Sequence, residues 1–296
     1  MAKRAPSRRG VAPKATSPVL ILHGGARGAF PSREMSPVYR EAMKAITAEA
    51  YKILEAGGSA VEAVTKAVSL LEDHPVFNAG RGSKIQSDGK IRMSAALMDG
   101  SLLRFSGVVN VEGLKNPIEL AKRLNSQNSR TLASRGARAK AKEWGLAFRS
   151  PFTEGRRDEF RNSKSGKSGT VGAVALDKNG RIASATSTGG RGMEWPDRVS
   201  DTPTVAGNYA NKFVGISATG TGEEIVDFAL CAKVATRVED GLDVVKAMKK
   251  SFAEAKRRDY EFGAIALAKD GTYSALTTTP FMLWSVQTHE ELKTNL

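Results

Sequence analysis

The pattern of apolar and polar residues along the chain predicts short buried strands and amphipathic helices. Residues 19–25 begin with four apolar residues, as a buried strand does, and end in His-Gly-Gly. Apolar residues then recur at helical spacing over residues 36–56, and two glycines follow them. Ser59 begins a second helix, and Glu62 completes a capping box with it. Because only a short turn joins these two helices, we expect them to pack side by side.

The middle of the chain combines strands, a helix and a linker. Residues 90–111 predict strands broken at Asp99-Gly100, and a helix begins near Asn116-Pro117. The basic continuation of this helix to Glu143 is either a solvated helix or an arm. Residues 150–169 are rich in Ser, Gly, Arg and Lys and contain few apolar residues, which is typical of a flexible linker.

The last part of the chain repeats the alternation of hairpins and helices. Residues 171–176 and 182–186 predict a hairpin, two helices follow at 223–238 and 243–256, and a final hairpin covers 264–278. Antiparallel sheets covered by helices, in a layered α+β domain, follow from this order of elements.

Composition narrows the class of protein. The chain has 296 residues, enough for a sizeable core, with 41% hydrophobic and 26% charged residues, as in an ordinary globular protein. No apolar run approaches the ~20 residues of a membrane helix. The single cysteine, Cys231, excludes an intramolecular disulfide and a Cys-rich zinc site. It also suits a reducing, cytoplasmic compartment.

The net charge of +14 first suggests nucleic acid or an anionic membrane as a partner. Residues 1–17 carry five basic and no acidic residues, and residues 122–149 carry eight basic residues and one acidic residue. The linker carries five basic and three acidic residues, which supplies the remaining +2, so the bulk of the chain is neutral. We interpret residues 1–17 as a disordered basic tail, with a transit peptide as the alternative, and residues 122–149 as a solvated basic face.

Conventional catalytic sets are scarce in this sequence. None of the three histidines has metal-binding spacing, and no nucleophile elbow, P-loop or dinucleotide fingerprint occurs. His23 is either a site residue or a structural histidine, and Cys231 fits a small buried hydrophobic residue better than a nucleophile.

Threonine and glycine are concentrated at strand ends, in residues 168–170, 186–190 and 219–222. Each cluster alone is weak evidence, because threonine favours strands and glycine favours turns. Together they allow another chemistry. A threonine at a new N-terminus supplies a hydroxyl nucleophile and, in its own α-amine, the base that activates it, so no histidine is needed.

Five ordered motifs resemble those of the plant-type L-asparaginases and isoaspartyl (β-aspartyl) peptidases, which are N-terminal-nucleophile (Ntn) hydrolases. The motifs are residues 23–26, 77–82, 169–177 with 186–190, 198–201 and 218–223. The resemblance implies an α+β fold built as a four-layer αββα sandwich. It also implies one domain made of an α subunit, residues 18–169, and a β subunit, residues 170–296.

The resemblance implies a self-processing nucleophile. An inactive precursor would cut itself between Gly169 and Thr170, assisted by Asn78. Thr170 would then be the nucleophile, with its freed amine as general base. Thr188 would hydrogen-bond to it.

The remaining site residues are implied in the same way. The Thr219 hydroxyl and the Gly220 N–H would form the oxyanion hole. Arg198 would bind the α-carboxylate of the substrate and Asp201 its α-ammonium group, while Thr219 and Gly222 would also contact the substrate.

The resemblance further implies hydrolysis of L-asparagine to aspartate and ammonia, and of β-aspartyl dipeptides. It implies no organic cofactor, no nucleic-acid or membrane partner, and a homodimer of cleaved units, (αβ)2. A structural Na⁺ would be held by the backbone carbonyls of Leu71, Glu72, His74, Phe77, Ala79 and Arg81.

Several residues depart from the family pattern. Asp197 and Ser200 stand where glycines are usual, and Glu194 replaces a frequent lysine. The two added carboxylates are expected to pair with Arg198 or to reshape the outer pocket. Arg27 and residues 278–280 also deviate. The alternatives are a glycosylasparaginase-like or threonine-protease-like Ntn hydrolase, or a catalytically inactive basic relative that binds nucleic acid. Gly169 argues against glycosylasparaginase, which has Asp there.

Overall fold

Two β-sheets form the interior of the fold. The computed structural model describes residues 16–27, 29, 32–162 and 169–296. Over these residues the larger sheet has eight strands, in the order β12-β11-β1-β5-β6-β2-β3-β4, and the smaller has four, in the order β10-β9-β8-β7. The larger sheet consists of β1 (Val19–Arg27), β2 (Met93–Asp99), β3 (Arg104–Val111), β4 (Thr131–Ala133), β5 (Val171–Leu176), β6 (Ile182–Thr188), β11 (Phe281–Gln287) and β12 (Leu292–Thr294). The smaller sheet consists of β7 (Asn208–Ala210), β8 (Val214–Gly220), β9 (Phe262–Ala268) and β10 (Tyr273–Thr277).

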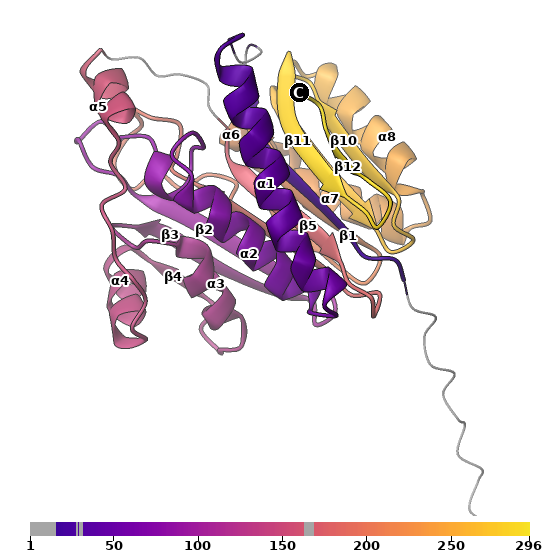
Figure 1. Ribbon diagram of the computed structural model, residues 1–296. Coiled ribbons are helices and arrows are strands. Elements are labelled where there is room, and N and C mark those ends of the chain that lie inside the picture. Colours follow the sequence, from indigo (N-terminus) through magenta and orange to yellow (C-terminus); the bar gives the residue numbers. More distant parts are fainter. Residues whose placement is uncertain (1–15, 28, 30–31, 163–168) are drawn as a thin grey trace, which may run out of the picture.

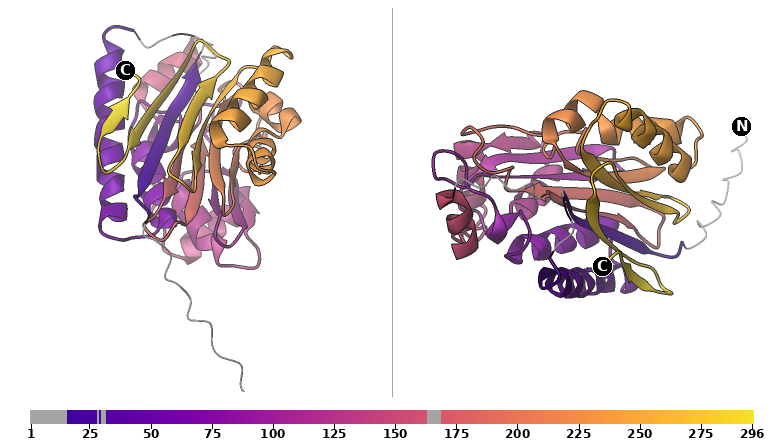
Figure 2. Two further views of the ribbon diagram at one scale, coloured as in Figure 1. Left: turned by 90° about the vertical axis from the view of Figure 1, so that its right-hand side faces the viewer. Right: turned by 90° about the horizontal axis from the view of Figure 1, so that it is seen from above.

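Helices cover the outer face of each sheet (Figure 1). They are α1 (Met35–Glu55), α2 (Ala60–Asp73), α3 (Pro117–Asn125), α4 (Ser134–Glu143), α5 (Glu154–Arg161), α6 (Gly222–Phe228), α7 (Leu230–Glu239) and α8 (Val244–Lys256), with a 3-10 turn at Gly80–Gly82. Helices α1, α2 and α3 contact the larger sheet, α7 and α8 contact the smaller one, and β1, β5 and β6 contact β8 or β9 between the sheets. Figure 2, seen from above, shows the two groups of helices on opposite sides of the strands. The layers therefore follow the order helices, sheet, sheet, helices, and the predicted α+β class is confirmed.

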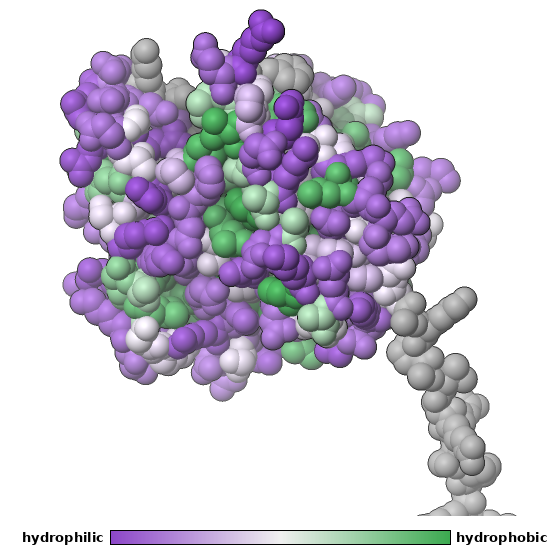
Figure 3. Space-filling view, viewed as in Figure 1, coloured by the Kyte–Doolittle hydropathy of each residue, from purple (hydrophilic) through white to green (hydrophobic). Residues whose placement is uncertain are grey.

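Each pair of neighbouring layers buries apolar side chains. One core cluster lies between α1, α2, α3 and the larger sheet, and a second lies between the smaller sheet and its helices. A third, which includes Ile21, Val174 and Ile265, fills the space between the two sheets. Hydrophilic residues cover most of the face seen in Figure 3. Over the described residues, no helix is long and apolar enough to cross a membrane.

The first two helices form as the sequence predicts. α2 begins after Ser59, whose hydroxyl accepts a hydrogen bond from the Glu62 N–H at 3.2 Å. The Glu62 carboxylate accepts the Ser59 N–H at 2.9 Å, which completes the predicted capping box. These bonds satisfy two backbone N–H groups that the helix itself cannot pair.

The helix predicted over residues 223–238 is wrong, because the chain is broken there into α6 and α7. Ala229 at the break has a left-handed backbone with φ +50°. Just after it, the Cys231 N–H donates to the carbonyl of Ala206, at 3.0 Å, instead of bonding within a helix. A tertiary hydrogen bond has replaced a helical one, which no local pattern signals.

Two predictions about boundaries also need correction. β1 runs on to Arg27, with a register shift against β11 between His23 and Gly25, so the His-Gly-Gly motif lies inside the strand. Strands β11 and β12 were not predicted, although β11 is the neighbour of β1 in the sheet.

The predicted linker and tail are described only in part. Within residues 150–169, α5 is helical, because Thr153 caps it and Arg156 forms an ion pair with Glu159 at 2.7 Å. Residues 163–168 and 1–15 lie outside the described residues. Thr16, in the predicted tail, hydrogen-bonds to the Lys178 and Asp177 carbonyls at 3.2 and 2.8 Å. The basic segment after α3 is neither one long helix nor an arm, since β4 interrupts it before α4.

We predict that Ser59→Ala lowers the free energy of unfolding by about 1 kcal/mol, the usual cost of removing an N-cap hydroxyl. Denaturant unfolding monitored by circular dichroism measures this change. Ser101→Ala, which removes an exposed turn hydroxyl, is the control and should change the free energy less. An equal loss in the two variants would contradict the capping argument.

Candidate active site

A pocket with a volume of about 310 Å³ opens where strands from both sheets end. The residues that line it come from the ends of β1, β6 and β8, from the two residues before β5, from the loop over residues 190–201, from the start of α6, and from positions near β9 and β10. They are Ala26, Gly169, Thr170, Thr188, Gly190, Arg191, Gly192, Met193, Arg198, Ser200, Asp201, Gly220, Thr221, Gly222, Glu223, Glu261 and Thr279. Seven of the nine residues predicted for catalysis, substrate binding and autocleavage therefore meet in one cavity, while Thr219 and Asn78 are not among its described lining residues.

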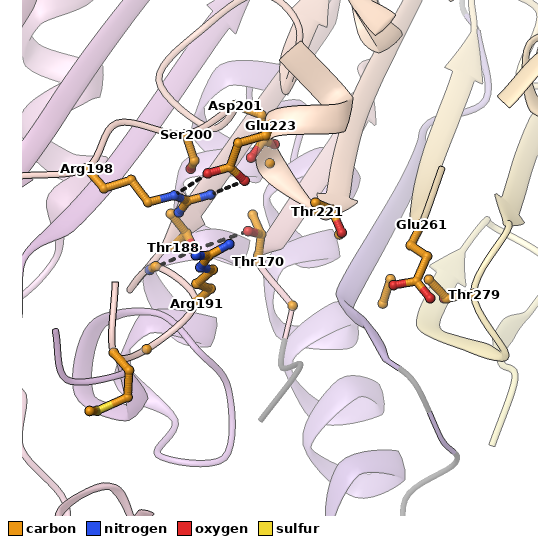
Figure 4. A pocket seen from close by; sticks show the side chains of 17 residues that line it. Thr170, Thr188, Arg191, Arg198, Ser200, Asp201, Thr221, Glu223, Glu261 and Thr279 are labelled. Atoms are coloured by element: carbon orange, nitrogen blue, oxygen red, sulfur yellow. Dashed lines mark hydrogen bonds and ion pairs between the residues drawn. The ribbon is translucent and has the colours of Figure 1, made fainter. Parts of the chain in front are cut away.

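The two threonines at the bottom of the pocket are hydrogen-bonded to each other. Thr170 is buried, and its hydroxyl donates to Thr188 Oγ1 at 3.1 Å (Figure 4). Thr188 Oγ1 also accepts the Gly190 N–H at 3.2 Å. β5 and β6 are antiparallel neighbours with Val171 opposite Ser187, so the hairpin itself brings the two hydroxyls together.

Gly169 is pressed against the end of β8. The structure describes one uninterrupted chain across Gly169 and Thr170. A Cβ atom added to Gly169 would lie 2.4 Å from Thr219 Oγ1 and 2.5 Å from the Ala26 nitrogen. Thr219 Oγ1 itself accepts the Ala26 N–H at 3.1 Å. Only glycine fits at this position without moving its neighbours.

Gly220 follows Thr219 at the end of β8. Its φ of +142° is one that side chains rarely adopt, and an added Cβ would lie 2.5 Å from Phe262 Cα. The close approach of β9 and the positive φ both require glycine here. Thr219, one of the two predicted oxyanion donors, thus stands beside Gly169, and Gly220 follows it on the sheet that faces Thr170.

The charged end of the pocket centres on Arg198. Its Nε and Nη2 atoms bind the two carboxylate oxygens of Glu223 at 2.6 and 2.7 Å. This pair lowers the pKa of Glu223 to about 2. The Asn110 side chain donates to the Arg198 carbonyl at 3.2 Å, so the backbone of the arginine is held as well.

Asp201 is almost fully buried beside Arg198. Burial raises the pKa of its carboxyl to about 7, and the nearby Arg198 opposes this shift only in part. Its Oδ2 atom has no hydrogen-bond partner among the described residues. A Cβ added to Gly222 would lie 2.8 Å from Asp201 Oδ1, so the glycine leaves the space that the carboxyl occupies.

The residues that depart from the family pattern differ in the groups that they contact. Asp197 pairs with Arg92, at 3.3 Å, so the expected pairing with Arg198 is wrong for this residue. Glu194 is buried, and a Cβ on Gly190 would lie 1.8 Å from its Oε1, so its carboxylate supports the loop that borders the pocket. Ser200 lines the pocket. Nothing is described of the Arg27 side chain.

Asn78 ties a second loop to this site. Its side chain donates to the Gly190 carbonyl at 2.5 Å and accepts the Lys84 N–H at 3.0 Å. The Gly189 N–H donates to the Asn78 carbonyl at 3.0 Å. Asn78 therefore holds the turn that directly follows Thr188, although it does not line the pocket.

The loop that was predicted to bind Na⁺ lies against the C-terminal end of α2. The carbonyls of Leu71, His74 and Ala79 accept backbone N–H groups at 3.1–3.3 Å. A Cβ on Gly80 would lie 2.1 Å from the Glu72 carbonyl oxygen, and one on Gly82 would lie 2.0 Å from that of Phe77. The predicted ligands are backbone carbonyl oxygens, which are the kind of ligand that a hard cation takes.

Five pocket residues lie outside the motifs found in the sequence, and Gly192 and Met193 are two of them. Arg191 and Glu261 line the pocket, and Thr279 belongs to a segment noted only as a departure from the family. Figure 4 shows Glu261 and Thr279 on the other side of Thr170 from Arg198. Glu261 reaches the pocket because Phe262 pairs with Gly220 across β8 and β9, a contact that no sequence motif reveals.

The basic segment over residues 122–149 uses much of its charge internally. Arg138 and Lys140 lie over the rings of Phe148 and Trp144, at 5.2 and 5.5 Å. Arg149 pairs with Asp73 at 2.8 Å. The aromatic rings that would stack on bases are covered by the cations of the chain itself, which disfavours a nucleic-acid platform.

Comparison with known proteins gives consistent results. The model of a family described as Asparaginase matches residues 16–168 and 150–296. A relative from Synechocystis sp. is 43% identical over 291 residues, which cover 92% of this chain and 88% of that protein. Relatives from Nostoc sp. and Homo sapiens are 41% and 35% identical, over 93% and 91% of this chain and 93% and 92% of theirs. All three carry the name isoaspartyl peptidase/L-asparaginase.

Proposed function

This chain belongs to the asparaginase family, and on that basis we propose that it is a self-processing threonine hydrolase of L-asparagine and β-aspartyl dipeptides. As a member of this family it is a hydrolase. The observation that supports the proposed chemistry best is the Thr170 hydroxyl, which is bonded to Thr188 in a pocket that also contains Arg198 and Asp201. We assign the four layers to the αββα sandwich of the Ntn hydrolases.

The charged end of the pocket is complementary to an α-amino acid. Because Glu223 occupies Nε and Nη2 of Arg198, the Nη1 donors remain to bind the α-carboxylate of the substrate. The Asp201 carboxylate accepts the α-ammonium group. Held at both groups, the substrate presents its β-carbonyl to Thr170, and such positioning lowers a barrier by up to ~7–11 kcal/mol.

Thr170 then attacks the substrate, and Thr219 stabilises the negative charge that develops on the carbonyl oxygen. The α-amine of Thr170, free after cleavage, takes the hydroxyl proton while Oγ1 attacks the β-carbonyl carbon. The Thr219 hydroxyl and the Gly220 N–H stabilise the oxyanion, where losing one donor typically costs ~2.7–4 kcal/mol. The amine returns the proton to the leaving ammonia or peptide amine, and water hydrolyses the resulting β-aspartyl ester of Thr170.

Processing uses the Thr170 hydroxyl and the oxyanion hole on the chain itself, and the hydroxyl proton passes to the Thr170 nitrogen as its peptide bond to Gly169 breaks. Thr170 Oγ1 attacks the Gly169 carbonyl carbon, the acyl group moves from nitrogen to oxygen, and water hydrolyses the ester. The close packing of Gly169 against Thr219 supports this role, because it puts the residue that carries the reacting carbonyl next to one of the proposed oxyanion donors.

We predict that the purified chain gives two bands on a denaturing gel, near residues 1–169 and 170–296, and that Thr170→Ala gives one. Without the hydroxyl no ester can form, so neither processing nor turnover occurs. N-terminal sequencing of the smaller band should read Thr-Val-Gly-Ala. A single uncut band from wild type with full asparaginase activity would rule out the mechanism.

We also predict that Gly169→Ala slows processing by on the order of a hundredfold, since displacing a reacting group by about 1 Å costs this much. The time course of band conversion measures the rate. Gly155→Ala is the matched control, because an added Cβ there meets nothing within 4 Å. Equal rates in the two variants would show that the space at Gly169 is irrelevant.

The raised pKa of Asp201 predicts the pH dependence of substrate binding. Only the ionised carboxyl attracts an ammonium group, and its pKa is about 7. The KM for L-asparagine should therefore rise as the pH falls below 7, approaching ~tenfold per unit once the protonated form dominates. Asp201→Asn should have a higher KM that varies little between pH 5 and 8. A wild-type KM that is constant over this range would contradict the assigned role.

We propose that the loop after α2 holds Na⁺ through the backbone carbonyls of Leu71, Glu72, His74, Phe77, Ala79 and Arg81. Each carbonyl has two lone pairs, so those that already accept one N–H can still bind a cation. The negative end of the α2 dipole adds to the attraction. Replacing NaCl by choline chloride should lower the temperature of thermal unfolding, and an unchanged temperature would count against the site.

We further propose that the cleaved units form a homodimer in the cytoplasm and that the enzyme needs no organic cofactor. Family membership supports the dimer. Light scattering of the eluted protein should give twice the chain mass of 31.6 kDa, and a value equal to one chain would exclude it.

A further inference from the structure

Behind the catalytic threonines lies a second layer of polar side chains. Thr186 precedes Thr188 by two residues on β6, and Ser217 precedes Thr219 by two residues on β8. Because side chains alternate along a strand, each polar residue points to the same side as its catalytic neighbour. Both therefore face the space between the two sheets, one step deeper than the pocket.

These residues form a continuous hydrogen-bond chain across the gap between the sheets. His23 Nε2 lies 2.8 Å from Ser217 Oγ, and Ser217 Oγ lies 2.7 Å from Thr186 Oγ1. Thr186 Oγ1 in turn donates to Asn208 Oδ1 at 3.1 Å. All four residues are fully buried. The chain links β1 and β6 of the larger sheet to β8 and β7 of the smaller one.

The same hydrogen-bonded residues also contact β5, the strand that begins directly after Thr170. His23 pairs with Gly172, two residues after Thr170. A Cβ added to Gly172 would lie 2.0 Å from Ser217 Oγ and 2.4 Å from His23 Nε2, so the glycine makes room for the chain. Burial lowers the pKa of His23 to about 3. A hydrogen bond to the Thr170 backbone raises this pKa, but its effect is smaller than that of burial. The imidazole is therefore neutral, with one donor and one acceptor nitrogen.

The geometry points to a positioning role: we propose that the hydrogen-bonded chain of His23, Ser217 and Thr186 fixes the distance between Thr170 and the oxyanion hole. None of these three residues is among those that line the pocket over the described part of the chain, and Thr186 and Ser217 lie two strand positions before Thr188 and Thr219. The proposal rests on the proposed function, because it assumes that Thr170 attacks and Thr219 stabilises.

The physical reason is that the two halves of the site belong to different sheets. Thr170 and Thr188 stand on the larger sheet and Thr219 on the smaller. Apolar side chains such as Ile21 and Ile265, whose contacts have no preferred direction, also fill the space between the sheets. Other hydrogen bonds join the sheets as well, from the Ala26 N–H to Thr219 Oγ1 at 3.1 Å and from the Ser184 hydroxyl to the Ile216 carbonyl at 2.8 Å. Hydrogen bonds are directional, and a catalytic site tolerates displacements of only about 0.5 Å.

The test removes single hydroxyl groups without changing the shape of the core. Thr186→Val is nearly isosteric, Ser217→Ala removes the next link, and Thr186→Ser keeps the hydroxyl. Ser106→Ala is the matched control, since Ser106 is fully buried and donates to the Ala121 carbonyl at 2.7 Å away from the pocket. Circular dichroism shows that each variant is folded at the assay temperature, and turnover of L-asparagine gives kcat and KM.

We expect Thr186→Val and Ser217→Ala to lower kcat by on the order of tenfold, as a small misplacement of reacting groups does. KM should change less than about twofold, because Arg198 and Asp201 are untouched. Thr186→Ser should recover most of kcat, and the double variant should lose little more than either single one. A folded variant that stays uncut while Ser106→Ala is processed also supports the proposal.

Two results overturn separate claims. Suppose that wild type hydrolyses asparagine and that Thr186→Val and Ser217→Ala lose no more kcat than Ser106→Ala. The positioning role is then wrong, and the proposed function stands. If wild type itself turns over neither asparagine nor a β-aspartyl dipeptide, the proposed function fails, and the positioning role fails with it.

Discussion

The antiparallel pairing of β5 with β6 is the constraint on which the rest of the site depends. Val171 lies opposite Ser187, and this register puts the hydroxyls of Thr170 and Thr188 within 3.1 Å. A slip of one residue would turn every side chain of the strand to the other face of the sheet. The turn at Asp177 guards against such a slip, because its carboxylate accepts the N–H groups of Asn179 and Arg181 at 2.9 and 3.0 Å.

Buried polar groups in the site lower the stability of the fold. Asp201 is buried, and one of its carboxylate oxygens has no hydrogen-bond partner among the described residues. An unsatisfied buried polar group typically costs ~1–3 kcal/mol. The apolar clusters on both outer sides of the sheets, which contain fully buried residues such as Leu22 and Phe262, offset this cost.

Local patterns predicted the parts of the fold that depend on local rules. The capping box at Ser59 and the β5–β6 hairpin follow from short-range chemistry, and the motif around Thr170 identified the proposed nucleophile. Contacts between distant segments were not predictable. The break at Ala229 comes from a hydrogen bond to Ala206, and Asp197 pairs with Arg92 of a distant strand instead of with its neighbour Arg198. Glu261 reaches the pocket only through the pairing of β8 with β9.

The strand order of the larger sheet has a consequence for the two pieces that a cut before Thr170 would produce. β1, which precedes the cut, is flanked by β11 and β5, which both follow it, while β6 is paired with the earlier strand β2. Strands of the two pieces thus meet at three places in one sheet, and neither piece could leave without breaking the hydrogen-bond ladders at all three. The cut would break the chain, but the two pieces would still unfold together as one sheet. The sheet that holds Thr170 must also be formed before the peptide bond can be cut. Once separated by denaturant, the pieces would have to find each other in a second-order reaction.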